Sequence, residues 1–485
     1  MKKTLFAAVM GALTAIAIAG LTFAQTYPPN IPVVSGPASI SPNDLFQDVV
    51  NGYPTAQSQY VSAANLAGFV GNGGVGTNFL IGGKADQNLW QRATTGSSVT
   101  TTLTYGGPDR WAYWSGTNTA MTVSKVSTAA ALPTGSANVF RMQRTASQTG
   151  VVQMCMAQEI TSANSYYLQG HTVLLDFNVY TGANFSGTGL TAYVSYGTGT
   201  DEGLAGTSSY AYGLNAGGGG SGSWTGQANA TAAVIPLGAV STAYRVAAVA
   251  SIPSTATEVA VALCYTPVGT ASTTDALYFD NISLRKADAL ASFVNTTAGY
   301  VLSNNVLTAT INGVVTNATI PPFSLRLYEE EQRNQLAYFF KIAEPAASKA
   351  VANGNYQTST ICDVQLPLPV PMRVAPTITI GGTSESNTTW AVMIASTTPV
   401  ALASTYLVQD AVIGNTTNMI ALQATTAAKT AGQGCTLVGA GGGANIQASA
   451  ELGCLRSAKR SGGRCSPLRK ASRPLGFPRR SAKSL

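Results

Sequence analysis

The chain has 485 residues, of which 10% are charged and 45% hydrophobic, and it contains 50 glycines. This length predicts about two domains plus connecting segments, and the high apolar content excludes a largely disordered chain. The formal net charge of +7 arises at the C-terminus. The last residues, Gly453–Leu485, hold ten of the 27 Lys and Arg and none of the 20 acidic residues. The rest of the chain therefore has 17 basic and 20 acidic residues. Because the chain before Gly453 has no excess of positive charge, its composition argues against nucleic acid as a partner.

The first 24 residues have the pattern of a secretory signal peptide. Two lysines precede the uncharged apolar run Leu5–Ala19, and Thr22 and Ala24 have the small side chains of a signal-peptidase site. The alternative is an uncleaved membrane anchor, because the uncharged run is just long enough to span a bilayer. We expect cleavage after Ala24, export, and a mature chain that makes no membrane contact.

Residues 76–286 show the alternation of half-buried strands. In the run 171–180, Val173, Leu175, Phe177 and Val179 fall on one face, and Asp176 and Asn178 fall on the other. Several short strands joined by Gly-rich turns predict a mainly β fold, either a jelly roll or a β-sandwich. The remaining segments are predicted by composition as an N-terminal attachment segment (25–75), a linker (287–323), a short helix followed by a smaller C-terminal β domain (324–452), and a basic disordered tail (453–485).

The segment 324–452 begins with a helix candidate and then returns to strand patterns. The helix is expected from about Ser324, which can cap it, to Ile342, with three glutamates in its N-terminal half, where carboxylates suit the helix dipole. Strands are expected at Val364–Leu368, Thr377–Ile380 and Trp390–Ile394.

The cysteines fall in pairs along the chain, and export makes disulfides permissible. Cys155, Cys264, Cys362 and Cys435 are the disulfide candidates, with their connectivity open. Cys155 and Cys264 are interpreted equally well as small buried hydrophobes. The absence of Cys-x-x-Cys spacing and the single histidine of the sequence, His171, argue against a structural zinc site.

No catalytic set emerges from the sequence. A Ser-His-Asp triad would need His171, but that residue begins a predicted strand and no Gly-x-Ser-x-Gly elbow exists to serve it. The glycine runs lack the Gly-Lys-Ser/Thr ending of a phosphate-binding loop. We therefore expect a binding protein with no catalytic residues and no organic cofactor.

The aromatic cluster at residues 109–114 is the strongest binding candidate. Strand alternation places Trp111 and Tyr113 on one face, and Arg110 and Trp114 on the other. Trp111 and Tyr113 are predicted to pack in the core, as large aromatic residues usually do, which leaves Trp114 as an exposed ring. The candidate ligand-binding residues are Trp90, Asp109, Arg110, Trp114 and Trp224.

Two stretches resemble the ends of jelly-roll carbohydrate-binding modules. The run Asn78-Phe79-Leu80-Ile81-Gly82-Gly83 followed by Trp90 is similar to their opening strand, and residues 277–284 are similar to their closing strand. The resemblance implies a possible structural calcium held by Asp86 and Asp280, since carboxylates suit a hard cation. Lys84, beside Asp86, argues against that ion.

Residues 76–452 also resemble bacteriophage and prophage tail fibre and appendage proteins. The motifs occur in the same order: Asn78–Ile81, Trp90-Gln91-Arg92, Pro108-Asp109-Arg110-Trp111, Leu168-Gln169-Gly170, Tyr338-Phe339-Phe340, Pro369–Thr377 and Ala448–Leu452. The resemblance implies a homotrimer that binds a bacterial surface glycan. The alternatives are a secreted adhesin or carbohydrate-binding protein encoded by a cell, and a surface-glycan depolymerase or esterase.

Overall fold

The computed structural model describes residues 45–48, 59–62, 77–93, 97–99, 105–115, 121–127, 136–202, 204, 224–271, 275–323, 326–343, 349–381, 390–394, 400–410, 413–439 and 445–451. The chain forms two compact units, Met1–Val75 and Gly76–Leu485. In the first unit, β1 (Leu45–Asp48) pairs antiparallel with β2 (Gln59–Ser62). The predicted signal peptide and basic tail lie outside the described residues.

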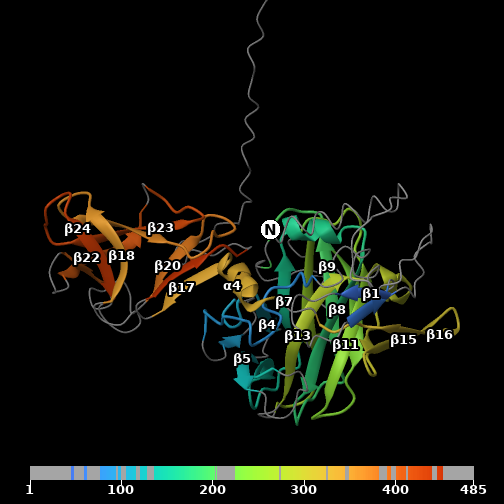
Figure 1. Ribbon diagram of the computed structural model, residues 1–485. Helices are drawn as coiled ribbons and strands as arrows, with labels where there is room; N and C mark the ends of the chain where they lie inside the picture. The colour runs from blue at the N-terminus through green and yellow to red at the C-terminus, as the bar shows by residue number, and fades with distance from the viewer. Residues whose placement is uncertain are drawn as a thin grey trace, which may run out of the picture. The chain divides into compact units, whose positions relative to one another are not determined.

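The second unit contains a sandwich of two antiparallel sheets (Figure 1). The five-stranded sheet has the order β10 (Ala228–Pro236), β9 (Gly189–Gly197), β12 (Glu258–Tyr265), β7 (Met154–Ile160) and β4 (Ala112–Ser115). The seven-stranded sheet has the order β14 (Tyr300–Val301), β11 (Ala243–Ser251), β8 (Thr172–Thr181), β13 (Ala276–Lys286), β6 (Asn138–Arg144), β5 (Met121–Ser127) and β3 (Ser97–Val99). A short helix α3 (Ser162–Ser165) and a 3₁₀ turn η1 (Tyr166–Leu168) precede β8. The prediction of a mainly β sandwich is confirmed.

The main core lies between the two sheets. Val173, Leu175, Phe177 and Val179 are fully buried in it, as their alternation along β8 predicted. The five-stranded sheet departs from simple alternation, because every residue of β7 and β12 is buried. Both faces of that sheet are therefore covered along β4, β7 and β12.

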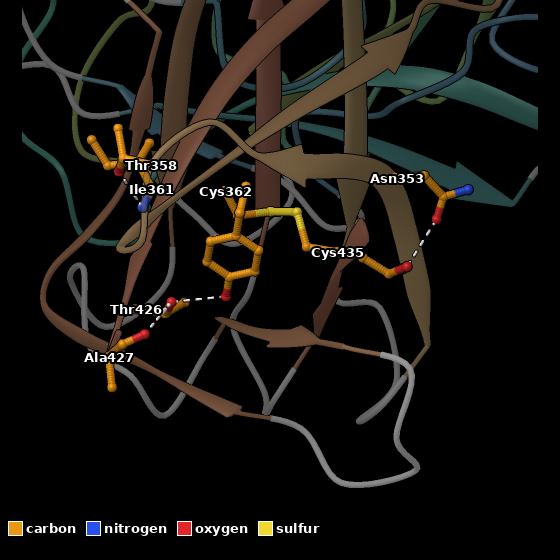
Figure 2. Close-up of a disulfide and its surroundings, with 9 residues drawn as sticks. Asn353, Thr358, Ile361, Cys362, Thr426, Ala427 and Cys435 are labelled. Atoms are coloured by element: carbon orange, nitrogen blue, oxygen red, sulfur yellow. Dashed lines mark hydrogen bonds between the residues drawn. A yellow bond between two sulfur atoms is a disulfide. The ribbon is translucent and has the colours of Figure 1, made fainter. Parts of the chain in front are cut away.

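Two disulfides join the candidate cysteines. Cys155 on β7 and Cys264 on β12 are cross-strand partners and form one bridge. Cys362 and Cys435 form the second, on β19 (Ile361–Pro367) and β24 (Gly434–Gly439) (Figure 2). A cross-link between residues far apart in sequence stabilises a domain by about 2–4 kcal/mol, chiefly by restricting the unfolded chain.

Residues 287–323, expected as a linker, contain ordered elements that cover part of the seven-stranded sheet. These are the 3₁₀ helix η2 (Asp288–Phe293), β14, and the hairpin of β15 (Val306–Ile311) and β16 (Val314–Thr319). Leu290, Phe293 and Leu302 form a second apolar cluster with Leu174 and Val249, which point away from the main core. The outer face of this sheet is thus covered on the part that carries apolar side chains.

The C-terminal part begins with α4 (Tyr328–Leu336), which is shorter than the predicted helix. Phe339 starts a strand, β17 (Phe339–Ala343), because it pairs with β25 (Asn445–Ser449), which also pairs with β20 (Thr377–Gly381). The expected cap, Ser324, lies outside the described residues. The other strands form a closed barrel in the order β18 (Ala350–Tyr356), β19, β23 (Met419–Thr426), β22 (Val400–Gln409), β21 (Trp390–Met393) and β24.

The predicted strands of this part overlap β19, β20 and β21, and the first of them, β19, begins three residues earlier than predicted. The disulfide of this part, between Cys362 and Cys435, is drawn in Figure 2. Tyr356 is the cross-strand partner of Cys362, and its hydroxyl makes a buried contact of 2.8 Å with Thr426 Oγ1. Within the described ranges, no helix is both long and apolar enough to cross a bilayer.

Candidate functional site

The tryptophans predicted to contact a ligand are buried. Trp90, Trp114 and Trp224 are 5%, 3% and 4% exposed, so none offers a ring face to a sugar. The prediction that Trp114 is exposed is therefore wrong, whereas the prediction that Trp111 lies in the core is confirmed. The physical reason is that β4 pairs with β7, in a sheet that is covered on both faces.

The indole N–H groups of these buried side chains hold loops to the sandwich. Trp90 Nε1 donates to the carbonyl oxygen of Ala85 at 3.3 Å, and Trp111 Nε1 donates to that of Gly82 at 3.0 Å. Trp224 Nε1 donates to the carbonyl oxygen of Glu202 at 2.5 Å. These contacts are structural, because a buried indole N–H needs an acceptor within the protein.

Arg110 lies in a buried ionic group that we call the arginine cluster, and Asp109 lies beside it. The cluster consists of Arg92, Arg110, Glu159, Tyr338 and Glu451. The Arg110 guanidinium lies 3.7 Å from the centroid of the Tyr338 ring, donates to the Glu159 carbonyl oxygen at 3.0 Å and pairs with Glu451. Arg92 pairs with Glu451 at 3.0 Å. Asp109 accepts from Gln91 Nε2 at 2.9 Å and is fully buried.

The arginine cluster brings together motifs that lie far apart in the sequence. Residues 90–92, 108–111, 338–340 and 448–452 carried the resemblance to tail fibre proteins, and side chains from each of these stretches meet there or on its border. Charges this deeply buried are available to each other and not to a ligand. The cluster therefore fastens α4, β17 and the chain after β25 to the sandwich.

Burial strongly affects the acids in and beside the cluster. Burial raises the pKa of Glu159 to about 7, with Arg110 opposing the shift and the neighbouring Glu451 carboxylate adding to it. Burial likewise raises the pKa of Asp109 to about 6, against the opposing effects of Arg92 and the hydrogen bonds from Gln91. Two arginines thus face three carboxyl groups, so full ionisation leaves an excess negative charge in a buried site.

Asp86 and Asp280 do not fit a calcium site. Asp86 accepts hydrogen bonds from the backbone N–H of Ala137 and from Asn138 Nδ2, both at 2.8 Å. Asp280 accepts from Ser136 Oγ at 2.5 Å and from the Ala85 backbone N–H at 3.4 Å. In the part of the chain that the structure describes, no group of three His, Cys, Asp or Glu side chains is arranged to hold a metal. The two carboxylates are used to fix the segment before β6.

A different set of side chains forms a row across the seven-stranded sheet, and we call it the tyrosine row: the buried Ser124 and the half-buried Arg141, Tyr278 and Tyr180. They are direct cross-strand partners on four neighbouring strands, β5, β6, β13 and β8. The two tyrosine rings lie edge to face, with centroids 5.6 Å apart and an interplanar angle of 61°. Arg141 Nε donates to Ser124 Oγ at 3.1 Å.

The tyrosine row points away from the main core. Its chain neighbours Phe140, Val179 and Phe279 are buried between the sheets, so alternation turns Arg141, Tyr180 and Tyr278 outwards. All three are half-buried, which is the state of side chains standing side by side on an open sheet face. Unlike the adjoining part of this face around Leu174, the row is not part of the apolar cluster formed with residues 287–323.

The sequence held a signal for one member of this row, Tyr180. Alternation placed Asp176 and Asn178 on the outer face of β8, and Tyr180 follows in the same phase. The direct pairing of Tyr278 with Tyr180 and with Arg141 depends on strand register, which one sequence does not determine. The row was therefore missed.

No family model matches the chain, and no curated protein matches it either. Among solved structures, the chain is similar to TmCBM61, solved in complex with β-1,4-galactotriose, at 8% identity and a TM-score of 0.25, over 44% of this chain and 99% of that one. It is also similar to the enzymatically active domain of tailspike protein 4 of bacteriophage CBA120, at 12% identity and a TM-score of 0.23, over 43% of this chain and 21% of that one. Both similarities are distant.

Proposed function

We propose that the protein is a non-catalytic binding protein that recognises a bacterial surface glycan through the tyrosine row. The observation that carries the proposal is the pair of tyrosine rings fixed side by side on an open sheet face. The apolar face of an aromatic ring packs against the C–H face of a sugar, while the phenol hydroxyl remains free to bond. Tyrosine has few rotatable bonds, so it loses little entropy when a ligand orders it.

A second exposed tyrosine pair provides the rival surface. Tyr166 and Tyr167 on η1 are 67% and 58% exposed, and their rings also lie edge to face, with centroids 6.1 Å apart. These residues belong to one short turn, whereas Tyr180 and Tyr278 are each held between two hydrogen-bonded strands. We prefer the tyrosine row to the pair on η1, because side chains on regular strands are positioned more accurately than those on loops.

For the biological setting, we propose a tail fibre or appendage protein of a phage or prophage, assembled as a homotrimer. The ordered motifs from Asn78 to Leu452 support this assignment through resemblance. The two disulfides suit an oxidising location outside the cell. A secreted adhesin encoded by a cell is the second candidate, favoured by the leader pattern, and its mature chain should begin at Gln25.

The proposal is tested with labelled full-length protein and bacterial cells before and after removal of their surface polysaccharide. Binding should fall to background on stripped cells, and the sugar released into the medium should not increase during incubation. Binding that survives stripping would point to a protein receptor, and release of oligosaccharides would show turnover. Antibody labelling distinguishes a tail protein, which should be found on virions, from a secreted adhesin, which should be found on cell surfaces.

A further inference from the structure

One positive charge on the tyrosine row, that of Arg141, has no carboxylate partner among the residues that the structure describes. Seven of the nine arginines in the described residues contact a carboxylate: Arg92, Arg110, Arg144, Arg245, Arg285, Arg326 and Arg373. Within the same residues, Arg141 and Arg333 have no carboxylate partner. Arg333 is exposed on α4, but Arg141 lies half-buried in the row that we propose as the binding surface.

The contact with Ser124 orients the Arg141 side chain. Its Nε donates to Ser124 Oγ at 3.1 Å, so the two terminal nitrogens remain as a fork for another acceptor. A planar guanidinium fork matches a carboxylate with two parallel hydrogen bonds. Asp280 lies two residues beyond Tyr278 on β13, but its oxygens accept from Ser136 and Ala85.

Arg141 is placed to bind a negatively charged substituent of a sugar ring that stacks on Tyr278. Arg141 and Tyr278 are direct cross-strand partners, so their Cβ atoms are about 5 Å apart. A sugar stacked on Tyr278 would place the substituents of its ring carbons beside the guanidinium. In a uronic acid, the carboxylate is attached directly to such a ring carbon.

We infer that the tyrosine row selects glycans that contain uronic acids, with Arg141 binding the sugar carboxylate. This inference rests on the proposed function, because it names the ligand class of the same surface. Tyr180 and Tyr278 supply the stacking, which neutral and acidic sugars share. Arg141 supplies the preference for the acid.

The test is affinity electrophoresis of the full chain through gels that contain one purified polysaccharide each. Polygalacturonate, alginate and hyaluronan are the uronic acid polymers, dextran and galactan are the neutral polymers, and dextran sulfate presents another anion. We expect retardation by at least one uronic acid polymer that exceeds retardation by either neutral polymer. The loss in Arg141→Gln should be about tenfold to about hundredfold in affinity, the range of hydrogen bonds to a charged group.

Arg333→Gln is the matched control, because it removes the same charge from the other unpaired arginine. It should retain the affinity of the unchanged chain, and Arg141→Lys should recover only part, because a lysine lacks the fork. Equal affinity of Arg141→Gln and the unchanged chain for uronic acid polymers would overturn the inference. So would loss in Arg333→Gln, or retardation that depends on Arg141 in dextran sulfate alone.

The tyrosine variants and Arg141→Gln together distinguish a failure of this inference from a failure of the proposed function. If Tyr180→Ala and Tyr278→Ala lose binding to every polymer while Arg141→Gln loses none, the surface is correct and the ligand class is wrong. If the tyrosine variants retain binding to all polymers, the surface itself is wrong.

Discussion

Arg110 and Arg141 both lie beside aromatic rings on the sandwich, yet their surroundings differ. Arg110 is 2% exposed, lies over Tyr338 and is paired with Glu451. Arg141 is half-buried, bonds only a serine among the described residues, and stands beside an open tyrosine. An arginine next to aromatic residues in a sequence is therefore no sign of a binding site. Burial and the presence of a carboxylate partner distinguish a structural charge from one available to a ligand.

The largest expected effect is the loss of the Arg110 guanidinium. Arg110→Ala should destabilise the protein by about 3–5 kcal/mol, because removing one partner leaves buried carboxylates without compensation. Arg141→Ala should change stability by less than about 0.5 kcal/mol, as a surface substitution does. Urea unfolding of both variants measures the contrast. Equal destabilisation by the two substitutions would erase the distinction between the sites.

The next effect is a dependence of stability on pH that originates in the arginine cluster. Glu159 has a pKa of about 7 in the folded protein, above the usual value of 4.5. Its protonated form is favoured by folding, so this contribution is complete below about pH 4.5 and is lost as the pH rises through about 7. The loss over the whole range should be about 3–4 kcal/mol, since one pKa unit corresponds to about 1.4 kcal/mol.

Glu159→Gln should remove the contribution of Glu159 to this dependence, because an amide does not titrate. Asp109, with a pKa raised to about 6, and Glu258, with a pKa raised to about 8, act in the same direction, so the variant should keep a slope that is shallower than that of the unchanged chain. Urea midpoints of both proteins at pH 5, 6, 7 and 8 provide the measurement. A midpoint that rises with pH over this range in the unchanged protein, but not in the variant, contradicts the assigned shift.

The fold was predictable where one face of a strand is buried and the other is open. Val173 to Val179 on β8 satisfy that condition, and the alternation assigned them correctly. Trp114 does not, because both faces of its sheet are covered and alternation then gives no information on exposure. The partner of Arg110, Glu451, lies 341 residues further along the chain, so the cluster was beyond any local pattern.

The smallest expected effect concerns the basic tail after Leu452. A chain that ends at Leu452 should have the melting temperature of the full chain, because ten like charges without an apolar pattern contribute no core. Glu451→Gln, one residue earlier, should lower the melting temperature by several degrees, because it weakens the pairing with Arg92 and Arg110. A large drop on removing the tail alone would show that it packs on the fold.

Cell binding by two double variants decides whether the tyrosine row is the glycan-binding surface. Tyr180→Ala with Tyr278→Ala removes the rings of the tyrosine row, and Tyr166→Ala with Tyr167→Ala removes the exposed pair on η1. Circular dichroism first confirms that both variants retain the fold of the unchanged chain. We predict that the first variant loses binding to cells that carry the glycan, by about tenfold or more, since two stacking contacts are lost, while the second binds as the unchanged protein does. Loss of binding in the η1 variant with full binding in the tyrosine row variant would contradict the account.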